Sequence, residues 1–384
     1  MKRHGELFEE LCRFENLYRA SRKARRSKRN RKDVEQFEFH LEKNLLELSE
    51  TLRNMTYRPG PFRSFTISDP KPRLISAAPY RDRIVHHALC NLLEPIFERT
   101  FIHDSYACRQ GKGTHAAVNR YQQFARQNLY VLKCDVRKFF PSIDHQILLS
   151  ILRRKIKDPG VIWLMSLLIG HSNVQEAVSG FFPHDDLFTQ SERRRGIPIG
   201  NQTSQFFANV MLNRLDHFIK EELGCCHYVR YADDFVVLGN DTRRLAEIRD
   251  AIESFLIGLR LWLHPQKRVI SRVCDGIRFL GFRVWPEYRW LVQPNVLRFR
   301  RRLRWMLREV RAGRLSQAEV TRSIRAWIGH AAHANTWRLR GQLLRCRFER
   351  GRATEVSCPS GRLVQQQSAE AAVDESQQEH PRQP

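Results

Sequence analysis

Two adjacent carboxylates, Asp233 and Asp234, lie between two short runs of strand-forming residues, 227–231 and 235–238. This pattern predicts a β-hairpin with both aspartates at its tip. A tight hairpin usually has Gly or Asn there, where a positive φ costs little, and neighbouring carboxylates repel each other. The pair therefore predicts a bound cation. Because Mg²⁺ is held by one or two carboxylates plus substrate phosphates, we expect a third carboxylate from a neighbouring strand.

Asp135 is the candidate for this third carboxylate, because it ends another strand-forming run, 130–135. If this strand lies beside the hairpin, three carboxylates meet at one edge of a sheet. Such a group suits two-metal phosphoryl or nucleotidyl transfer, in which one cation activates the attacking oxygen and the other holds the leaving group. A lone Asp is more often a helix cap or a solvated turn residue. We accept that interpretation for Asp144, which precedes a predicted helix at 147–152.

The composition favours a polyanionic partner. The chain has 384 residues, with 66 Lys and Arg against 41 Asp and Glu and a net charge of +25. This length predicts two or three domains or subdomains, and the positive charge favours nucleic acid. No apolar run reaches membrane-spanning length, and no apolar signal segment is present near Met1. The nine Cys include no Cys-x-x-Cys pair, so we expect neither a disulfide framework nor a zinc site, which fits the cytoplasm.

Changes in sequence character along the chain predict four regions: a basic helical extension (1–55), a mixed region (56–290), a helical region (291–350) and a disordered tail (351–384). The irregular alternation of strands and helices in the second region predicts the α+β class. The first region contains a dense basic run, 19–32, between two predicted amphipathic helices. Such a run is often a solvated spacer, but here we expect its basic residues to bind nucleic-acid backbone: Arg22, Lys23, Arg25, Arg26, Lys28 and Arg29.

The sequence motifs of residues 1–345, taken in the order in which they occur along the chain, resemble those of the reverse transcriptases of bacterial mobile elements. The resemblance is closest to the enzymes of diversity-generating retroelements. The resemblance implies a right-hand polymerase fold, with fingers and palm over 56–290 and a helical thumb over 291–350. It implies RNA-templated attack of a primer 3′-hydroxyl on a deoxynucleoside triphosphate, with two Mg²⁺ ions. The implied partners are a template RNA, the RNA/cDNA duplex, the dNTPs and a small accessory protein.

The same resemblance assigns roles to the residues around the aspartates. Segments 135–144 and 231–234 correspond to the two metal-binding motifs, which makes Asp135, Asp233 and the backbone carbonyl of Val136 metal ligands, with Asp234 in a supporting role. Phe140 falls at the steric-gate position, where a bulky ring excludes a ribose 2′-hydroxyl. We interpret Phe139 as a core residue.

Further basic residues match motifs that contact the nucleotide or the template. Arg73, and after it Lys71, lie in a segment that resembles the fingers strand over the incoming triphosphate, where a guanidinium matches phosphate oxygens. Arg109 and Lys112 lie in the next fingers motif and are expected to contact the template. Lys267 matches the lysine thought to protonate the leaving pyrophosphate.

Two later segments also match. Residues 276–282 resemble the primer grip and 327–334 resemble the thumb of this group. The thumb-like segment contains His330 and His333, but no Cys or acidic residue is spaced to complete a metal site with them. We interpret both histidines as packing or backbone contacts.

The segment 197–205 discriminates between subgroups. Most reverse transcriptases have Gln before Gly200 and end the motif in Ser-Pro. This chain has Ile199 and Ser204-Gln205 instead, the pattern of diversity-generating retroelements. Ile199, Gly200 and Gln205 are thus candidate substrate-binding residues. An apolar side chain in place of one that forms hydrogen bonds is expected to relax nucleotide selection, and the resemblance implies errors concentrated at template adenines.

Two alternatives remain. The first is a group II intron, retron or phage-defence reverse transcriptase; the lack of a recognisable maturase or endonuclease extension after the thumb counts against the intron type. The second belongs to a different class, a basic RNA-binding scaffold on an inactive polymerase fold, since a fold alone does not establish activity. The intact group of three aspartates argues against it, and a primer-extension assay separates the two classes.

Overall fold

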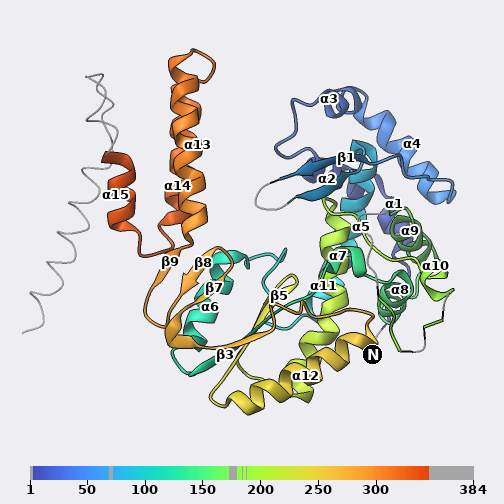
Figure 1. Ribbon diagram of the computed structural model, residues 1–384. Coiled ribbons are helices and arrows are strands. Elements are labelled where there is room, and N and C mark those ends of the chain that lie inside the picture. Colours follow the sequence, from blue (N-terminus) through green and yellow to red (C-terminus); the bar gives the residue numbers. More distant parts are fainter. Residues whose placement is uncertain (1–2, 69–71, 173–179, 184, 187, 346–384) are drawn as a thin grey trace, which may run out of the picture. The chain divides into compact units, whose positions relative to one another are not determined.

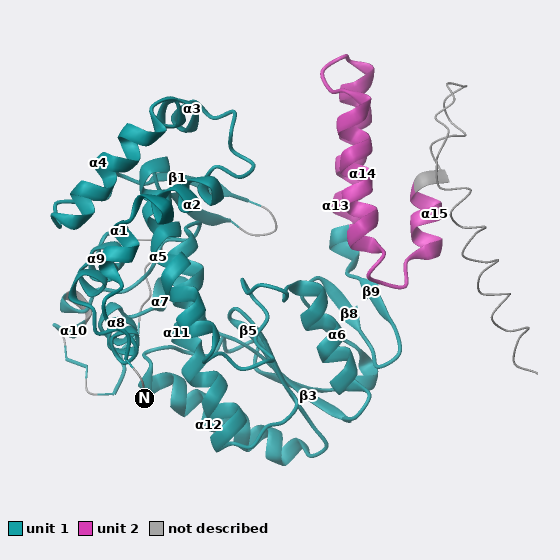
Figure 2. Cartoon of the chain, turned by 180° about the vertical axis from the view of Figure 1, so that it is seen from behind, with its two compact units in different colours: residues 1–295 teal, residues 296–384 magenta. Residues whose placement is uncertain are grey.

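The computed structural model describes residues 3–68, 72–172, 180–183, 185–186 and 188–345, so Lys71 lies outside the described residues. The chain forms two compact units, 1–295 and 296–384 (Figures 1 and 2). Within the described ranges, no helix is both long and apolar enough to cross a membrane.

Four helices open the first unit: α1 (Phe8–Cys12), α2 (Phe14–Ala24), α3 (Lys32–Phe39) and α4 (Leu41–Arg53). The prediction that the basic run 19–32 lies between helices is wrong for its first part, because Arg19 to Ala24 continue α2. Leu17, Ala20 and Ala24 are buried at helical spacing, so one face of α2 remains apolar while its other faces carry basic residues.

A small sheet and a long helix follow. Strand β1 (Arg63–Ile67) pairs antiparallel with β2 (Arg73–Ala77), and α5 (Tyr80–Glu98) begins three residues later. The N-terminal helices are tied to α5 by a buried hydrogen bond from Asn16 Nδ2 to the carbonyl oxygen of Ala88, 3.2 Å long. Helices α2 and α5 are thereby packed together.

A four-stranded antiparallel sheet forms the centre of the first unit, in the order β4-β5-β3-β6. Its strands are β3 (Tyr130–Asp135), β4 (Tyr228–Tyr231), β5 (Asp234–Gly239) and β6 (Val269–Arg272), and the surrounding helices are α6 (Thr114–Ala125), α7 (Phe139–Ser142), α8 (His145–Arg153), α9 (Pro159–Gly170), α10 (Thr189–Glu192), α11 (Gln202–His217), the π-helix η1 (Phe218–Glu222) and α12 (Thr242–Gly258). This arrangement of antiparallel strands and helices confirms the α+β prediction.

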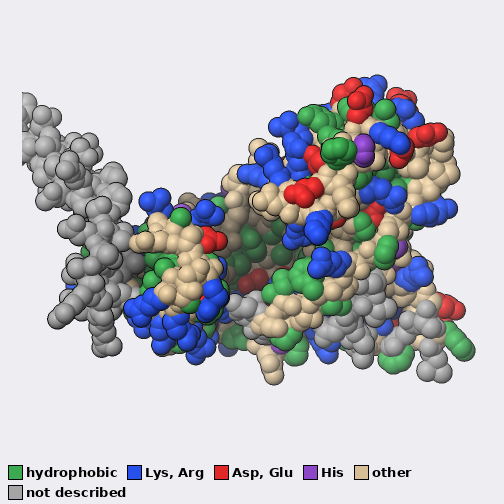
Figure 3. All heavy atoms as spheres, turned by 90° about the horizontal axis from the view of Figure 1, so that it is seen from above, with side chains coloured by type: hydrophobic (Ala, Val, Ile, Leu, Met, Phe, Trp, Pro, Cys, Tyr) green, Lys and Arg blue, Asp and Glu red, His purple; other side chains and the backbone are tan. Residues whose placement is uncertain are grey.

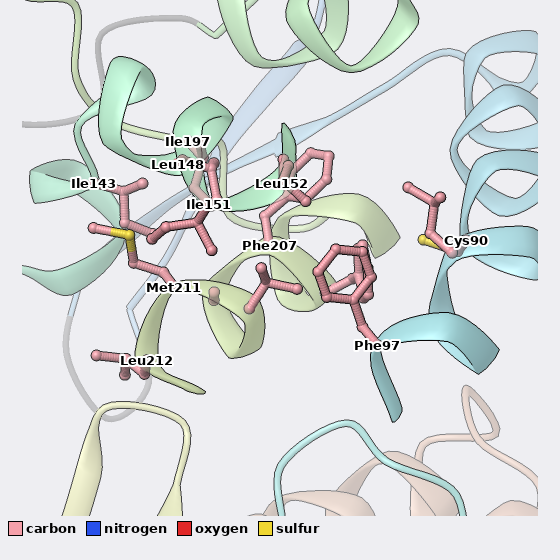
Figure 4. Packing of buried hydrophobic residues seen from close by; sticks show 14 of the residues in the cluster. Cys90, Phe97, Ile143, Leu148, Ile151, Leu152, Ile197, Phe207, Met211 and Leu212 are labelled. Atoms are coloured by element: carbon pink, nitrogen blue, oxygen red, sulfur yellow. The ribbon is translucent and has the colours of Figure 1, made fainter. Parts of the chain in front are cut away.

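The largest core lies between this sheet and the helices. Figure 4 shows Phe207 and Met211 of α11 beside Leu148 and Ile151 of α8. Helix α8 begins at the predicted cap: Asp144 accepts a hydrogen bond from the Ile147 amide at 3.0 Å, which satisfies a donor that the first helical turn leaves unpaired. The buried core fixes the strands that carry the aspartates.

The first unit ends in a second antiparallel sheet of three short strands: β7 (Ile277–Phe279), β8 (Phe282–Val284) and β9 (Arg289–Leu291), preceded by the 3₁₀ turn η2 (Val273–Asp275). Phe279 and Phe282 are fully buried. The ring of Tyr121 in α6 lies 5.7 Å from the ring of Phe279. One face of this sheet is therefore packed against α6.

The described part of the predicted helical region 291–350 contains α13 (Gln293–Arg311), α14 (Gln317–Ala331) and α15 (Trp337–Arg345). In the second unit, the rings of Phe299 and Trp327 stack 4.2 Å apart, and a capping box between Ser316 and Glu319 begins α14. Partial burial, with a smaller contribution from His333, lowers the pKa of His330. Figure 3 shows Lys and Arg side chains gathered on this unit, and α13 supplies several of them: Arg298, Arg300, Arg301, Arg302, Arg304 and Arg308.

Candidate active site

The three aspartates meet at one edge of the central sheet, as predicted from the two strand-forming segments. β3 pairs with β5 so that Asp135 lies directly opposite Asp234, and the Val136 amide donates to the carbonyl oxygen of Asp233 at 3.1 Å. The hairpin is shorter than predicted, because Tyr231 pairs with Asp234. Only Asp233 and the preceding alanine form the tip, and Asp234 is the first residue of β5.

The turn itself has an unusual backbone. Ala232 has φ 54°, a conformation in which residues other than glycine are uncommon. It allows the chain to reverse within two residues while both strands remain paired. Asp233 is thereby held at the tip and Asp234 is fixed in the ladder opposite Asp135.

Burial and the charges of neighbouring carboxylates raise the pKa values of Asp233 and Asp234. The pKa of Asp233 is raised mainly by burial and then by the charge of Asp135. Burial, with the charges of Asp135 and Asp233 and against that of Lys133, raises the pKa of Asp234 to about 6. Asp234 Oδ1 is also buried without a hydrogen-bond partner within the described residues. A nearby positive charge would favour the ionised forms of these carboxyls.

A divalent cation at the aspartates would need ligands besides the carboxylates of this chain. Among the residues that the structure describes, no three carboxylate, imidazole or thiol groups are arranged to hold one metal ion. Asp234 Oδ2 lies 3.5 Å from Lys133 Nζ. Two carboxylates completed by substrate phosphates are the usual surroundings of protein-bound Mg²⁺.

Lys267 reaches this group from the segment that precedes β6. Its Nζ donates to Asp135 Oδ2 at 2.8 Å, and both side chains are partly exposed. The segment is held beside β3, because the His264 amide donates to the carbonyl oxygen of Asp135 at 2.8 Å. The structure thus brings an ammonium group to the aspartates from 132 residues along the chain.

The predicted nucleotide-contacting residues gather around β2 and the loop before α11. The Ser76 amide in β2 donates to the carbonyl oxygen of Ile199 at 2.9 Å. Gly200 has φ 122°, and a Cβ there would lie 2.9 Å from a methyl carbon of Ile75. Arg73 is exposed at the start of β2, and its charge offsets a small part of the rise in the pKa of Asp233. Arg73, Ile199 and Gly200 therefore lie on the side of the site formed by β2.

The two phenylalanines after β3 have different surroundings. Phe139 lies in the core, whereas Phe140 is half-buried. Their rings meet edge to face with centroids 5.6 Å apart. The carbonyl oxygen of Phe140 accepts from the Ile197 amide at 3.0 Å, which joins α7 to the loop of Ile199. Gln205 is exposed in the first turn of α11.

The basic run in α2 and the following turn lies on the surface and is partly paired. Arg22 is exposed, with its guanidinium 5.9 Å from the Tyr18 ring centroid. Lys23 donates to Asn91 at 2.5 Å, and Arg25 forms an ion pair with Glu38 at 2.5 Å. The remaining members of the run are exposed or half-buried: Arg26, Lys28 and Arg29. Partial burial, and then nearby Arg83, lowers the pKa of Lys28.

The structure favours a structural role for Arg109 over a contact with the template. Its side chain is 6% exposed and forms an ion pair with Glu98. It also donates to the carbonyl oxygens of Ile102 and Ser105. Lys112 donates to a neighbouring carbonyl oxygen at 2.9 Å and is partly exposed.

The sequence interpretation missed Arg230, which lies in β4, one strand of the hairpin, and is fully buried. Its Nε and Nη2 donate to the two carboxylate oxygens of Asp216 at 2.7 and 2.6 Å. Its Nη1 donates to the carbonyl oxygen of Ala232 at 3.1 Å and to Asn209 Oδ1 at 3.2 Å. The sequence contained one signal for this role, an arginine inside an otherwise apolar strand. Such an arginine is expected to be buried, and a buried charge needs a buried partner.

Comparison with known proteins gives a consistent result. The sequence profile described as reverse transcriptase (RNA-dependent DNA polymerase) matches residues 68–284. Protein YkfC of Escherichia coli is 28% identical over 279 residues, which cover 62% of this chain and 70% of that protein. Group II intron-encoded protein LtrA of Lactococcus lactis is 25% identical over 307 residues, which cover 63% of this chain and 49% of that protein.

Two further similarities are weaker. The putative COX1/OXI3 intron 1 protein of Saccharomyces cerevisiae is 22% identical over 62% of this chain and 34% of that protein. The chain therefore spans half or less of the two intron-encoded relatives. A telomerase structure from Candida albicans matches with a TM-score of 0.42 at 12% identity, over 62% of this chain and 46% of that one, which is too low to support an argument.

Proposed function

Because this chain belongs to the reverse transcriptase family of RNA-dependent DNA polymerases, we propose that it copies an RNA template into DNA at the edge of the β4-β5-β3-β6 sheet. The observation that carries the proposal is the register that sets Asp135 opposite Asp234, with Asp233 in the adjoining turn. The substrates are a primer with a free 3′-hydroxyl, deoxynucleoside triphosphates and a template RNA.

Asp135, Asp233 and the backbone carbonyl of Val136 would hold two Mg²⁺ ions, with Asp234 in support. When bound, these ions supply activation of the attacking 3′-hydroxyl and stabilisation of the leaving pyrophosphate. Lys267 holds a proton 2.8 Å from Asp135 Oδ2, and from there donates it to the pyrophosphate. Arg73 binds phosphate oxygens of the nucleotide through its guanidinium.

Primer extension by the purified chain tests this function. We expect it to extend a DNA primer on an RNA template with dNTPs and Mg²⁺, and to stop when EDTA removes the metal, because the cations supply activation of the 3′-hydroxyl and stabilisation of the leaving group. The measurement is product length on a denaturing gel. Retained RNA binding without extension under these conditions would instead identify an RNA-binding scaffold on a polymerase fold.

Replacing Phe140 by Val is expected to admit ribonucleotides, because we assign its half-buried ring to the space that a ribose 2′-hydroxyl needs. The ratio of rNTP to dNTP incorporation efficiencies should rise by at least about tenfold, equivalent to about 1.4 kcal/mol of lost discrimination. Phe139→Val is the matched control, because that ring lies in the core and its loss should lower stability without changing the ratio. An unchanged ratio for Phe140→Val would place the gate elsewhere.

Within the family, we assign the chain to the diversity-generating group, in which copying is error-prone at template adenines. The assignment depends on Ile199, an apolar residue in a loop that is hydrogen-bonded to β2, and on Ser204-Gln205. The likeness to LtrA, a group II intron-encoded protein, favours an intron-type reverse transcriptase as the second candidate. The diversity-generating and the intron-type enzyme are expected to differ in copying fidelity. A small accessory protein is expected only for the diversity-generating enzyme.

Replacing Ile199 by Gln is expected to lower misincorporation opposite template adenine more than opposite the other bases. An apolar side chain adds no hydrogen bond to the correct pair, so the correct and incorrect pairs differ by a smaller free energy. One hydrogen bond contributes about 1 kcal/mol, which corresponds to roughly a fivefold change in error rate. The measurement is sequencing of cDNA copied from one defined RNA.

The matched control for this experiment is Ile199→Val, which keeps the side chain apolar and should leave the error spectrum unchanged. If the Gln variant has the same spectrum as the native chain, Ile199 is a packing residue and the intron-type alternative becomes the better assignment.

A further inference from the structure

We propose that Arg260, which follows the end of α12, is a positioning residue that places Lys267 beside Asp135. It acts by fixing the start of the segment 260–267, whose last residue carries the ammonium group. The inference rests on the proposed polymerase function, in which Lys267 protonates the leaving pyrophosphate. It adds to that function a residue outside the matched motifs, which itself touches no substrate.

Arg260 occupies a backbone position that usually belongs to glycine. Its φ is 56°, and α12 ends there in a Schellman motif. The Arg260 amide donates to the Ile257 carbonyl oxygen and the Leu261 amide donates to the Leu256 carbonyl oxygen, both at 2.9 Å. This motif places the residue after the helix cap in the left-handed conformation, which glycine adopts most easily. A long side chain at such a position points to a role for the side chain itself.

The guanidinium of Arg260 contacts three side chains. Its Nη1 and Nη2 donate to the two carboxylate oxygens of Asp185 at 2.5 and 2.7 Å. Its Nε lies 3.5 Å from Asp144 Oδ2, and its Cζ lies 4.8 Å from the centroid of the Phe182 ring. The side chains of Asp144 and Asp185 are only 3% and 2% exposed. Two parallel hydrogen bonds to one shielded carboxylate define a single geometry, so they fix the end of α12.

The residues that follow the end of α12 pair with the end of β3. The Arg137 amide donates to the Trp262 carbonyl oxygen at 2.7 Å, and the His264 amide donates to the Asp135 carbonyl oxygen at 2.8 Å. These two hydrogen bonds form a short antiparallel ladder beside the aspartates. Because the ladder begins two residues after Arg260, the position of the helix end determines how this segment lies along β3.

A turn after the ladder brings Lys267 back to Asp135. The Lys267 amide donates to the His264 carbonyl oxygen at 3.0 Å, and Lys267 Nζ donates to Asp135 Oδ2 at 2.8 Å. Both side chains are partly exposed, and an ion pair in contact with water holds a lysine only weakly. The fixed segment behind the lysine therefore has to position it. A reacting group that moves by about 1 Å can lose about 10²-fold in rate, so the contact between Arg260 and Asp185 affects the reaction from a distance.

The test is a double-mutant cycle on single-turnover primer extension by the full chain. Arg260→Gly suits the left-handed backbone and removes only the side chain. It should lower the maximal rate by roughly 10- to 100-fold. The dNTP concentration that gives half the maximal rate should change by less than about twofold, because we assign nucleotide binding to other segments. In a Lys267→Ala background, Arg260→Gly should change the rate by less than about twofold, because its effect passes through the lysine.

Hydrogen exchange measures the positioning without catalysis. In Arg260→Gly, the His264 amide should exchange roughly tenfold faster, because the ladder with β3 opens more often. The amides of β5, which pairs with the other edge of β3, should keep their native protection. Asp185→Asn breaks the same contact from its other side and leaves the arginine in place. It should cause the same changes in extension and exchange to a smaller extent.

Met55→Gly is the matched control, because Met55 has the same backbone position after α4. Its φ is 53°, and the Met55 and Thr56 amides donate to the carbonyl oxygens of Leu52 and Thr51 at 3.0 and 2.9 Å. Its side chain is exposed. The variant should extend primers at the native rate and keep the native exchange at His264.

A native extension rate in Arg260→Gly would overturn the inference. A rate loss as large in the Lys267→Ala background as in the native chain would also overturn it and leave Arg260 a role in folding alone. Native extension by Lys267→Ala, or no extension by the native chain, would instead contradict the proposed function. In either of those cases, native exchange at His264 in Arg260→Gly would overturn the inferred placement, and faster exchange would support it.

Discussion

Asp233→Asn is expected to lower the rate of primer extension by at least about 10³-fold, with RNA affinity nearly unchanged. The variant keeps the size of the side chain and removes the negative charge, so a cation that stabilises the transition state by several kcal/mol is lost. Asp135→Ala should have the same effect. Duplex affinity is dominated by backbone contacts. The measurements are single-turnover extension and RNA binding on the same preparation.

Stability separates a catalytic from a structural role for this residue. The folded-state pKa of Asp233 is raised, so its ionisation disfavours the fold as the pH rises above the unfolded value. Asp233→Asn removes this effect and should be at least as stable as the native chain at neutral pH without metal. Asp250→Asn, on the surface of α12, is the control and should extend normally. Appreciable extension by Asp233→Asn or Asp135→Ala would refute the metal assignment.

Arg230→Met is expected to lower both the stability and the extension rate, because it removes the guanidinium that bonds to Asp216 and to the Ala232 carbonyl oxygen. Removing one partner of a buried ion pair costs about 3–5 kcal/mol, since the other charge remains buried alone. The measurements are denaturant unfolding and the Mg²⁺ dependence of extension. Half-maximal extension should need more Mg²⁺, because the turn that presents Asp233 has lost its support.

A second variant shows whether Arg230 positions the turn or only maintains the fold. The double variant Arg230→Met with Asp216→Asn removes both charges. In the native chain the Tyr228 hydroxyl donates to Asp216 at 2.8 Å, and the asparagine would still accept this hydrogen bond. We expect this pair to recover much of the stability but not the native Mg²⁺ dependence, because the Ala232 carbonyl oxygen still lacks its donor. A native Mg²⁺ dependence in the double variant would assign Arg230 to folding alone.

The local patterns predicted much of the site correctly. The strand-forming runs placed Asp135 at a strand end and Asp233 at a hairpin tip. The pairing of β3 with β5 and the hydrogen bond from the Val136 amide to the Asp233 carbonyl oxygen confirm that the two segments meet. The cap at Asp144 and the contrast between Phe139 and Phe140 were also predictable. Each depends on nearest neighbours in the chain or on a single burial pattern, which the sequence contains directly.

Other features depend on residues far apart in the chain, and their local patterns gave a wrong or incomplete answer. Arg109 looked like a template contact in a basic, glycine-rich segment, but the fold places Glu98 and two carbonyl oxygens around its guanidinium. Asp234 was predicted at the hairpin tip, and the pairing of Tyr231 with it moved it into the ladder. Burial and long-range partners decide such roles, and a local pattern specifies neither.

The sequence by itself determined the family, the strand ends that carry the aspartates and the excess of positive charge, because motif order, hydrophobic period and composition are local or additive properties. The tertiary structure decided which charges face one another. It placed the Lys267 ammonium beside Asp135, paired buried Arg230 with Asp216 next to the turn of Ala232 and Asp233, and set Arg278 opposite Arg283 across two strands. These pairings follow from the register of strands and the packing of helices, which depend on the whole chain folding at once.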